Sequence, residues 1–215
     1  MVNAAIETKK SFPARAARHE KQRQITRQRL LAAAVEVFVE QGYLRTTVED
    51  ILVRAAVSRA TFYAHFDDKL AVMRTVAVEA GPAWRPLFDE LGYSGSWTRD
   101  DVTDWASRLI ALYRRRGALS VLVNSVAATE DAVFAALAEQ RKVLVASLAE
   151  KSPAFHRATE SAAGYLRADL MLQNLDLACY HVACRDIDAG GDDAANIVAE
   201  IVIGFLAANA RAGSK

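Results

Sequence analysis

Apolar residues recur every three or four positions along most of the chain, which is the spacing of one face of an α-helix. In the N-terminal third this spacing predicts four helices, at about 22–41, 47–55, 58–65 and 68–80. Gly42 is expected to end the first helix. Thr46 or Thr47 is expected to cap the second, and Ser58 the third. Residues 1–20 show little apolar periodicity, so we expect a mobile arm there.

The remainder of the chain has the same period. A loop is expected at 91–97, and a turn near 189–193 separates the last two helices. The long patterns fall at about 100–116, 118–128, 130–151, 155–187 and 192–210. The fourth of these has a break near Ser161–Gly164. No segment alternates in the manner of a strand, so the sequence predicts an all-α fold.

The two short helices near 47–55 and 58–65, joined by a tight turn and preceded by a longer helix, have the proportions of a helix-turn-helix. In that motif the second helix places its N-terminal residues in the major groove of DNA. Candidate contacts with bases or phosphates are Ser58, Arg59, Ala60 and Thr61. Arg59 is the member of this set that could bind guanine in a bidentate manner. Candidate phosphate contacts, which position the protein without reading sequence, are Thr47, Tyr63, His65 and Lys69.

Each of these residues also has an interpretation without DNA. Thr61 would serve equally as a core or capping hydroxyl, and Tyr63 as a packed surface aromatic. His65 would contact phosphate or cap the recognition helix, while Phe62 and Phe66 are expected to be core.

Three ordered motifs resemble the DNA-binding domain of the TetR family of transcriptional regulators. They are AAVEVF at 33–38, TTVEDI at 46–51 and AAVSRATFYAHF at 55–66, followed by an acidic-lysine turn. The resemblance implies a homodimer whose C-terminal half binds a small molecule. It divides the chain into an arm at 1–20, a helix-turn-helix domain at 21–68 and a ligand-binding and dimerisation domain at 69–215. Ala56 departs from the family, which commonly has Gly there; a positive φ would make Ala unfavourable by about 1 kcal/mol.

The last two helical patterns, 165–187 and 192–210, suit an antiparallel pair. Small residues that would allow close helix approach are Ala195, Ala199, Gly204 and Ala208. A helix this apolar needs burial on more than one side. We expect the pair and its mates in a second chain to form a four-helix dimer interface; the alternative is that both helices only close the core of one chain.

Ligand sites combine apolar walls with a few polar groups. On that ground the candidate ligand contacts are Trp105, Tyr113, Asn124, Asn174 and Tyr180. Trp105 and Asn174 also follow from a similarity to EthR-like members of the family, in which a tryptophan and a later asparagine line an apolar channel. The expected ligand is small and apolar or aromatic. Core hydrogen bonding is the alternative role for Asn124.

Charge is distributed unevenly along the 215 residues, whose net charge is +1. The first 29 residues hold eight basic and two acidic side chains, which leaves a charge of −5 on the remainder. A basic segment on an acidic body favours a polyanionic partner such as DNA; a solvated tail is the alternative. Without an export signal or an apolar run of about 18 residues, we expect a cytoplasmic protein with no membrane partner.

The sequence offers little for catalysis, so we expect no enzyme activity and no cofactor. GYSGS at 92–96 lacks the final glycine of a nucleophile elbow. Cys179, His181 and Cys184 cluster, yet helical spacing keeps them from meeting at one metal ion; structural thiols or a redox sensor remain as interpretations. The chain is therefore interpreted as a DNA-binding transcriptional regulator, a repressor by family resemblance, that a ligand releases from a palindromic operator. The competing interpretation is an α-helical module for protein–protein contact.

Overall fold

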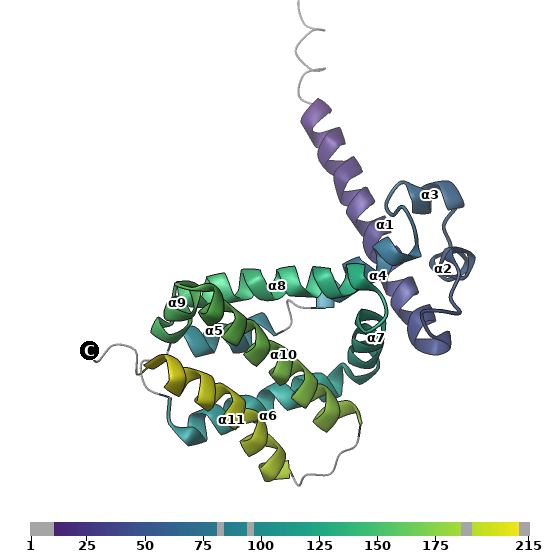
Figure 1. Cartoon of the computed structure of the whole chain (residues 1–215). Helices are drawn as coiled ribbons and strands as arrows, with labels where there is room; N and C mark the ends of the chain where they lie inside the picture. Colours follow the sequence, from purple (N-terminus) through teal and green to yellow (C-terminus); the bar gives the residue numbers. More distant parts are fainter. Residues whose placement is uncertain (1–10, 81–83, 94–96, 186–190, 211–215) are drawn as a thin grey trace, which may run out of the picture. The chain divides into compact units, whose positions relative to one another are not determined.

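The computed structural model describes residues 11–80, 84–93, 97–185 and 191–210 (Figure 1). Within these ranges every regular element is a helix, which confirms the all-α prediction. The chain divides into two compact units, Met1–Thr75 and Val76–Lys215. The division falls inside a helix, whereas the sequence placed the boundary at residue 68.

The first unit contains α1 (Ser11–Gln41), α2 (Val48–Ala55), α3 (Arg59–Tyr63) and the start of α4 (Lys69–Ala80). Its fully buried side chains are those that the apolar period singled out, among them Leu30, Phe38, Ile51, Phe62 and Met73. Burying such side chains contributes most of the favourable free energy of folding. Because they come from all four helices, this core fixes the orientation of the short α3.

Helix α1 begins at Ser11, about eleven residues before the expected start. Residues 14–24 are rich in Ala, Arg, Lys and Gln, which favour helix without forming an apolar stripe. Apolar periodicity therefore could not detect this part of α1. The expected arm is helical over residues 11–20, and residues 1–10 lie outside the described residues. At its other end α1 stops where predicted, since Gly42 adopts a φ of 84°.

The turn between α2 and α3 is built by its caps. Thr47 and Asp50 form a reciprocal capping box at the start of α2. At the other end Ala56 is left-handed, with φ 50° and ψ 51°, and its N–H bonds back to the last turn of α2. Arg29 of α1 donates to the carbonyl oxygen of Ala56 at 2.8 Å. The positive φ that the sequence raised for Ala56 is thus present.

The described residues of the second unit form seven further helices. They are α5 (Arg85–Tyr93), α6 (Arg99–Arg115), α7 (Gly117–Ala127), α8 (Asp131–Ala149), α9 (Pro153–Thr159), α10 (Ala162–Cys184) and α11 (Gly191–Ala210). The break expected near Ser161–Gly164 separates α9 from α10. Gly164 is needed there, because a Cβ would lie 2.6 Å from the carbonyl oxygen of Ala158. Helix α5 was missed, since its nine residues are too few for a convincing period; part of the expected loop at 91–97 is therefore helical.

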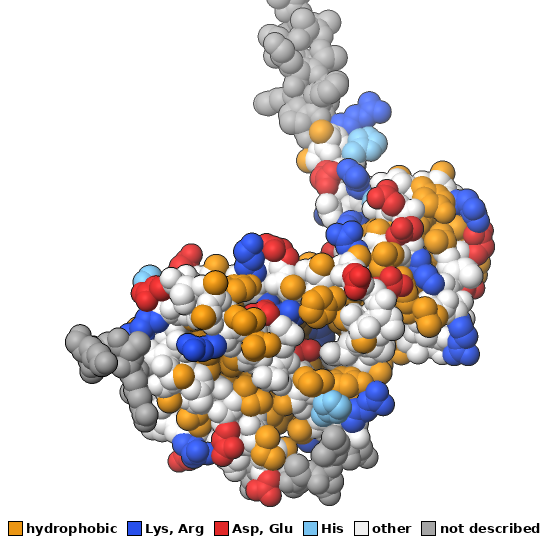
Figure 2. Space-filling model, viewed as in Figure 1, with side chains coloured by type: hydrophobic (Ala, Val, Ile, Leu, Met, Phe, Trp, Pro, Cys, Tyr) orange, Lys and Arg blue, Asp and Glu red, His pale blue; other side chains and the backbone are white. Residues whose placement is uncertain are grey.

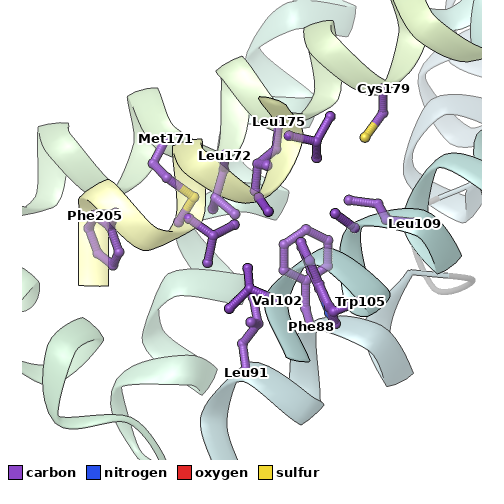
Figure 3. Close-up of a cluster of buried hydrophobic side chains, with 14 of the residues drawn as sticks. Phe88, Leu91, Val102, Trp105, Leu109, Met171, Leu172, Leu175, Cys179 and Phe205 are labelled. Atoms are coloured by element: carbon purple, nitrogen blue, oxygen red, sulfur yellow. The ribbon is translucent and has the colours of Figure 1, made fainter. Parts of the chain in front are cut away.

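The core of the second unit is formed by α5, α6, α8, α9, α10 and α11, and Figure 3 shows part of it. Trp105 of α6 is at its centre, fully buried, and its ring meets Phe88 edge-on at 5.5 Å between centroids. The indole N–H of Trp105 donates to the carbonyl oxygen of Leu87 at 2.7 Å. This bond satisfies the polar atom of the tryptophan, as burial requires.

No single described helix has the length and apolar character to cross a membrane, although α7 and α8, bent by 113° at their junction, pass that test as a pair by length and composition only.

Candidate functional site

Helix α3 presents one polar face. Ser58 caps it, accepting a hydrogen bond from the N–H of Thr61 at 3.1 Å, and the two hydroxyl oxygens lie 2.8 Å apart. Arg59 and Ala60 are exposed in the first turn, and Tyr63 is 48% exposed. Phe62 points the opposite way and is fully buried. The first turn of α3 therefore offers hydroxyl, guanidinium and phenol groups above an anchored aromatic.

Arg59 forms an ion pair on this face. Its guanidinium Nη2 donates to the Oε2 of Glu49 in the first turn of α2. Both side chains remain more than half exposed, at 63% and 59%. Exposed ion pairs of this kind stabilise a protein by at most about 1 kcal/mol. A stronger acceptor can therefore replace Glu49 as the partner of Arg59.

Thr47 and His65 flank this face. The hydroxyl of Thr47 is already used in the capping box, where it donates to Asp50 Oδ2 at 2.7 Å. His65 follows α3 and is partly buried. Burial lowers the pKa of His65, and the nearby Arg23 and Arg27 lower it further. A neutral imidazole provides one donor for a phosphate and adds no positive charge.

Lys69 has partners within the first unit, and the phosphate contact expected of it stays a prediction. Its ammonium donates to the carbonyl oxygens of Tyr43 and Thr46, each at 2.8 Å. The same nitrogen lies 4.5 Å from the centroid of the Tyr43 ring. Lys69 thus fastens the segment between α1 and α2 by donating to two of its carbonyl groups.

Basic side chains follow the first half of α1 (Figure 2). Arg15, Arg18, Lys21 and Arg23 are all exposed. This run accounts for much of the positive charge that the sequence concentrates in its first 29 residues. It attracts polyanions in a manner that salt weakens.

The second unit encloses two described cavities, of about 60 and 30 Å³. Both are lined by Trp84, Tyr113, Val123 and Asp176. The larger one adds mainly apolar side chains from α5, α6, α8 and α10, including Phe88, Leu109, Leu144 and Leu172. Apolar walls with a few polar groups are typical of small-molecule sites.

A hydrogen-bonded polar pair, Tyr113 and Asp176, lines both cavities. The Tyr113 hydroxyl donates to Asp176 Oδ1. Burial raises the pKa of Tyr113 well above its ordinary value, and the neighbouring carboxyl of Asp176 raises it further, so the phenol stays protonated. Burial also raises the pKa of Asp176, while the hydrogen bond from Tyr113 and the charge of Arg141 act against that rise.

The predicted ligand contacts divide into two groups. Tyr113 and Asn124 do line a described cavity, and Asn124 also donates to the carbonyl oxygen of Ser120 at 3.1 Å. Trp105, Asn174 and Tyr180 line neither of the two. Trp105 is core, and Tyr180 is buried with its hydroxyl accepting from Arg185 at 2.9 Å.

Asn174 is exposed, because it shares a face of α10 with the exposed Leu170 and Leu177. The structure therefore places neither residue of the EthR-like similarity, Trp105 or Asn174, on these cavity walls. Trp84 lines both cavities and was missed. It lies between α4 and α5, in a stretch where the apolar period of the sequence predicts no helix.

Neither cysteine lines one of the two described cavities. Cys179 is buried, and burial raises the pKa of its thiol far above the ordinary value. Cys184 is partly buried, and its pKa is also raised by burial. Thiols kept protonated in this way are poor nucleophiles. Among the described residues no group of His, Cys, Asp and Glu side chains is placed to hold a metal ion.

Apolar side chains are exposed along α10 and α11, and Figure 2 shows such side chains, mixed with polar ones, on the second unit. They include Leu166, Leu170, Leu177 and Ile197, whose exposed fractions are 54%, 47%, 50% and 53%. Large apolar side chains that gather on an exposed face are typical of an interaction surface. We call these four residues the apolar face.

Comparison with known proteins agrees with the helix-turn-helix geometry of the first unit. Residues 30–81 match the family model of bacterial regulatory proteins, tetR family. Over 73 residues the chain is 41% identical to the HTH-type transcriptional regulator SrpR of Pseudomonas putida, a match covering 34% of each chain. It is 39% identical over 51 residues to the HTH-type transcriptional repressor BepR of Brucella suis, covering 24% of each. The chain thus spans only part of the length of these relatives.

Solved structures extend the likeness in fold to the second unit. Salmonella enterica GusR has a TM-score of 0.63 at 22% identity, with 85% of this chain and 95% of that one covered. A putative TetR-family transcriptional regulator from Syntrophomonas wolfei has a TM-score of 0.64 at 15% identity, covering 86% and 96%. The matched family model and the regulators SrpR and BepR do not favour the protein–protein module considered from the sequence.

Proposed function

We propose that the chain is a transcriptional repressor of the tetR family, released from a palindromic operator by a small ligand; the match of residues 30–81 to the family model supports this. The observation that carries this proposal is the exposed first turn of α3, with Arg59 above the buried Phe62. A recognition helix needs this combination of a rigid base and free polar side chains.

Arg59 is the proposed base-reading residue. It is the exposed cation in the first turn of α3, and guanine offers two acceptors in the major groove that a guanidinium fits. Its exposed pair with Glu49 holds it on the same face until DNA replaces the carboxylate. Ser58 and Tyr63 then supply phosphate contacts, which set the register of the helix on the duplex.

The apolar face supports a homodimer. In this dimer the apolar faces of two copies pack against one another. The contact removes four side chains from water: Leu166, Leu170 and Leu177 of α10, and Ile197 of α11. Such burial is favourable by about 25 cal/mol per Å² of apolar surface. A two-fold dimer presents two α3 helices to two half-sites, which accounts for a palindromic operator.

Ligand release requires that the ligand bind one state of the dimer better than the other. Helix α4 offers the physical link, because it belongs to both units. Lys69 fastens its first turn to the segment after α1, and Ala77 of the same helix lines the smaller cavity. A ligand that displaces Ala77 therefore acts on the helix that Lys69 anchors.

The test replaces Arg59 with alanine and compares binding to duplexes that differ at single base pairs. Arg59→Ala should lose about 1–3 kcal/mol of discrimination at one position of each half-site. Arg114→Ala, which removes the same charge from an exposed site on α6, is the matched control and should leave discrimination unchanged.

Glu49→Gln sharpens the comparison. Releasing Arg59 from Glu49 should strengthen binding to the preferred duplex, because the arginine no longer exchanges one partner for another. If Arg59→Ala keeps the full base preference while binding DNA, the role proposed for Arg59 is wrong.

A further inference from the structure

We propose that the larger cavity of the second unit binds an uncharged, mainly apolar molecule carrying one group that both accepts and donates a hydrogen bond, such as a carboxamide or a hydroxyl. The inference rests on the proposed function, which assigns a ligand to this unit, and adds the chemistry of that ligand. Three features of the cavity carry it: its walls, its charge balance and two buried polar atoms.

The walls specify the body of the ligand. Trp84 and Phe88 contribute aromatic rings, while Leu109, Leu144 and Leu172 contribute branched aliphatic side chains. Such walls exclude water and favour an aromatic or alicyclic body, whose transfer from water is favourable. They provide no hydrogen bonds, so any polar group of the ligand must be met elsewhere in the cavity.

The charge balance excludes an ionic ligand. The charged residues lining the larger cavity are Arg141 and Asp176, one of each sign. Arg141 is further balanced by Asp169, whose Oδ1 accepts from its Nε at 2.7 Å, with both side chains about 15% exposed. The Arg141–Asp169 pair is neutral as a whole, and burial raises the pKa of Asp176, which favours the uncharged form of that carboxyl. An ionic ligand of either sign would therefore add a charge that no neighbouring group balances, which is unfavourable in a buried site.

Two residues that line this cavity each carry a buried polar atom without a partner among the described residues. The amide of Gln140 donates to the carbonyl oxygen of Val78, and its own Oε1 is buried without a donor. The guanidinium of Arg141 uses Nε on Asp169, and its Nη2 is buried without an acceptor. Buried polar atoms are nearly always paired, so this acceptor and this donor are available for a ligand.

The cavity is smaller than a ring-sized ligand, and Gln140 Oε1 and Arg141 Nη2 are buried. A volume of about 60 Å³ holds a few water molecules. A ring-sized ligand must widen it, and the walls that separate would uncover Gln140 Oε1 and Arg141 Nη2. A ligand group with a donor and an acceptor then satisfies both atoms, whereas an apolar ligand satisfies neither.

Four probes with one benzene ring separate the possibilities: benzamide, toluene, benzoate and benzylammonium. Their dissociation constants are measured on the full chain by ligand-observed NMR, with the fluorescence of the cavity-lining Trp84 as a second signal. Benzamide should bind about 10-fold more tightly than either ion, and about 3- to 10-fold more tightly than toluene, as expected for two added hydrogen bonds.

Two variants test the polar atoms. Gln140→Leu removes the unpaired acceptor, and Arg141→Lys removes Nη2 while keeping a positive charge beside Asp169. Each should weaken benzamide about 5-fold and leave toluene within about 2-fold. Circular dichroism checks that each variant folds. If Arg141→Lys does not fold, the benzamide affinity of Gln140→Leu tests the inference by itself.

Tighter binding of either ion, benzamide no tighter than toluene, or an unchanged benzamide affinity in Gln140→Leu would overturn the inference. So would the failure of all four probes to bind up to their solubility limits. Binding of duplex DNA by the same preparation keeps the two proposals apart. A chain that prefers a palindromic duplex but shows the wrong probe order loses only the ligand chemistry, while a chain without DNA preference loses the proposed function.

Discussion

Replacing Ala56 with glycine should stabilise the first unit. Ala56 has a φ of 50° in the turn between α2 and α3. A left-handed conformation is unfavourable for an L-residue by roughly 1–2 kcal/mol, and glycine avoids this at a loss of about 0.5–1 kcal/mol in chain entropy. The difference predicts that Ala56→Gly raises the free energy of unfolding by about 0.5–1 kcal/mol.

Thermal and urea unfolding of the full chain measure this change. A gain of that size raises Tm by about 4 °C if the first unit unfolds separately, and by about 2 °C if the whole chain unfolds together. Ala32→Gly is the matched control, because Ala32 is an exposed position inside α1. It should lower the free energy of unfolding by about 1 kcal/mol. An Ala56→Gly variant destabilised as much as Ala32→Gly would refute the argument from backbone strain.

Two further predictions concern single side chains. Lys69→Met leaves the carbonyl groups of Tyr43 and Thr46 without their donor, so urea unfolding should show a loss of about 2 kcal/mol; a change below about 0.5 kcal/mol would contradict this. Leu170→Glu places a charge in the apolar face and should give a folded monomer by analytical ultracentrifugation, while Leu44→Glu, at an 80% exposed position of the first unit, should remain dimeric. A dimeric Leu170→Glu variant would remove Leu170 from the interface.

Local signals predicted the helix-turn-helix well. Thr47 and Ser58 cap the helices for which they were proposed, and Gly42 ends α1 with a positive φ. These features depend on residues three or four positions apart, so the sequence contains all of their determinants. The same locality placed Phe62 and Phe66 in the core.

Contacts between residues far apart in the sequence could not be predicted from such local patterns. Lys69 finds its carbonyl partners 23 and 26 residues earlier in the chain, which no spacing rule reveals. Asn174 and Asp176 both interrupt an apolar run, yet Asp176 lines a cavity and Asn174 is exposed. Which face of α10 turns inward depends on α6 and α8, and it is fixed only once the helices pack.

The central claim is tested most directly by selecting duplexes from a random pool with the wild-type chain and titrating the recovered sequence at several salt concentrations. We predict an inverted repeat with half-site centres about one helical turn apart, or a multiple of it. Affinity for this repeat should fall steeply as salt rises. A recovered pool with the composition of the starting pool, or binding that salt does not weaken, would contradict the account.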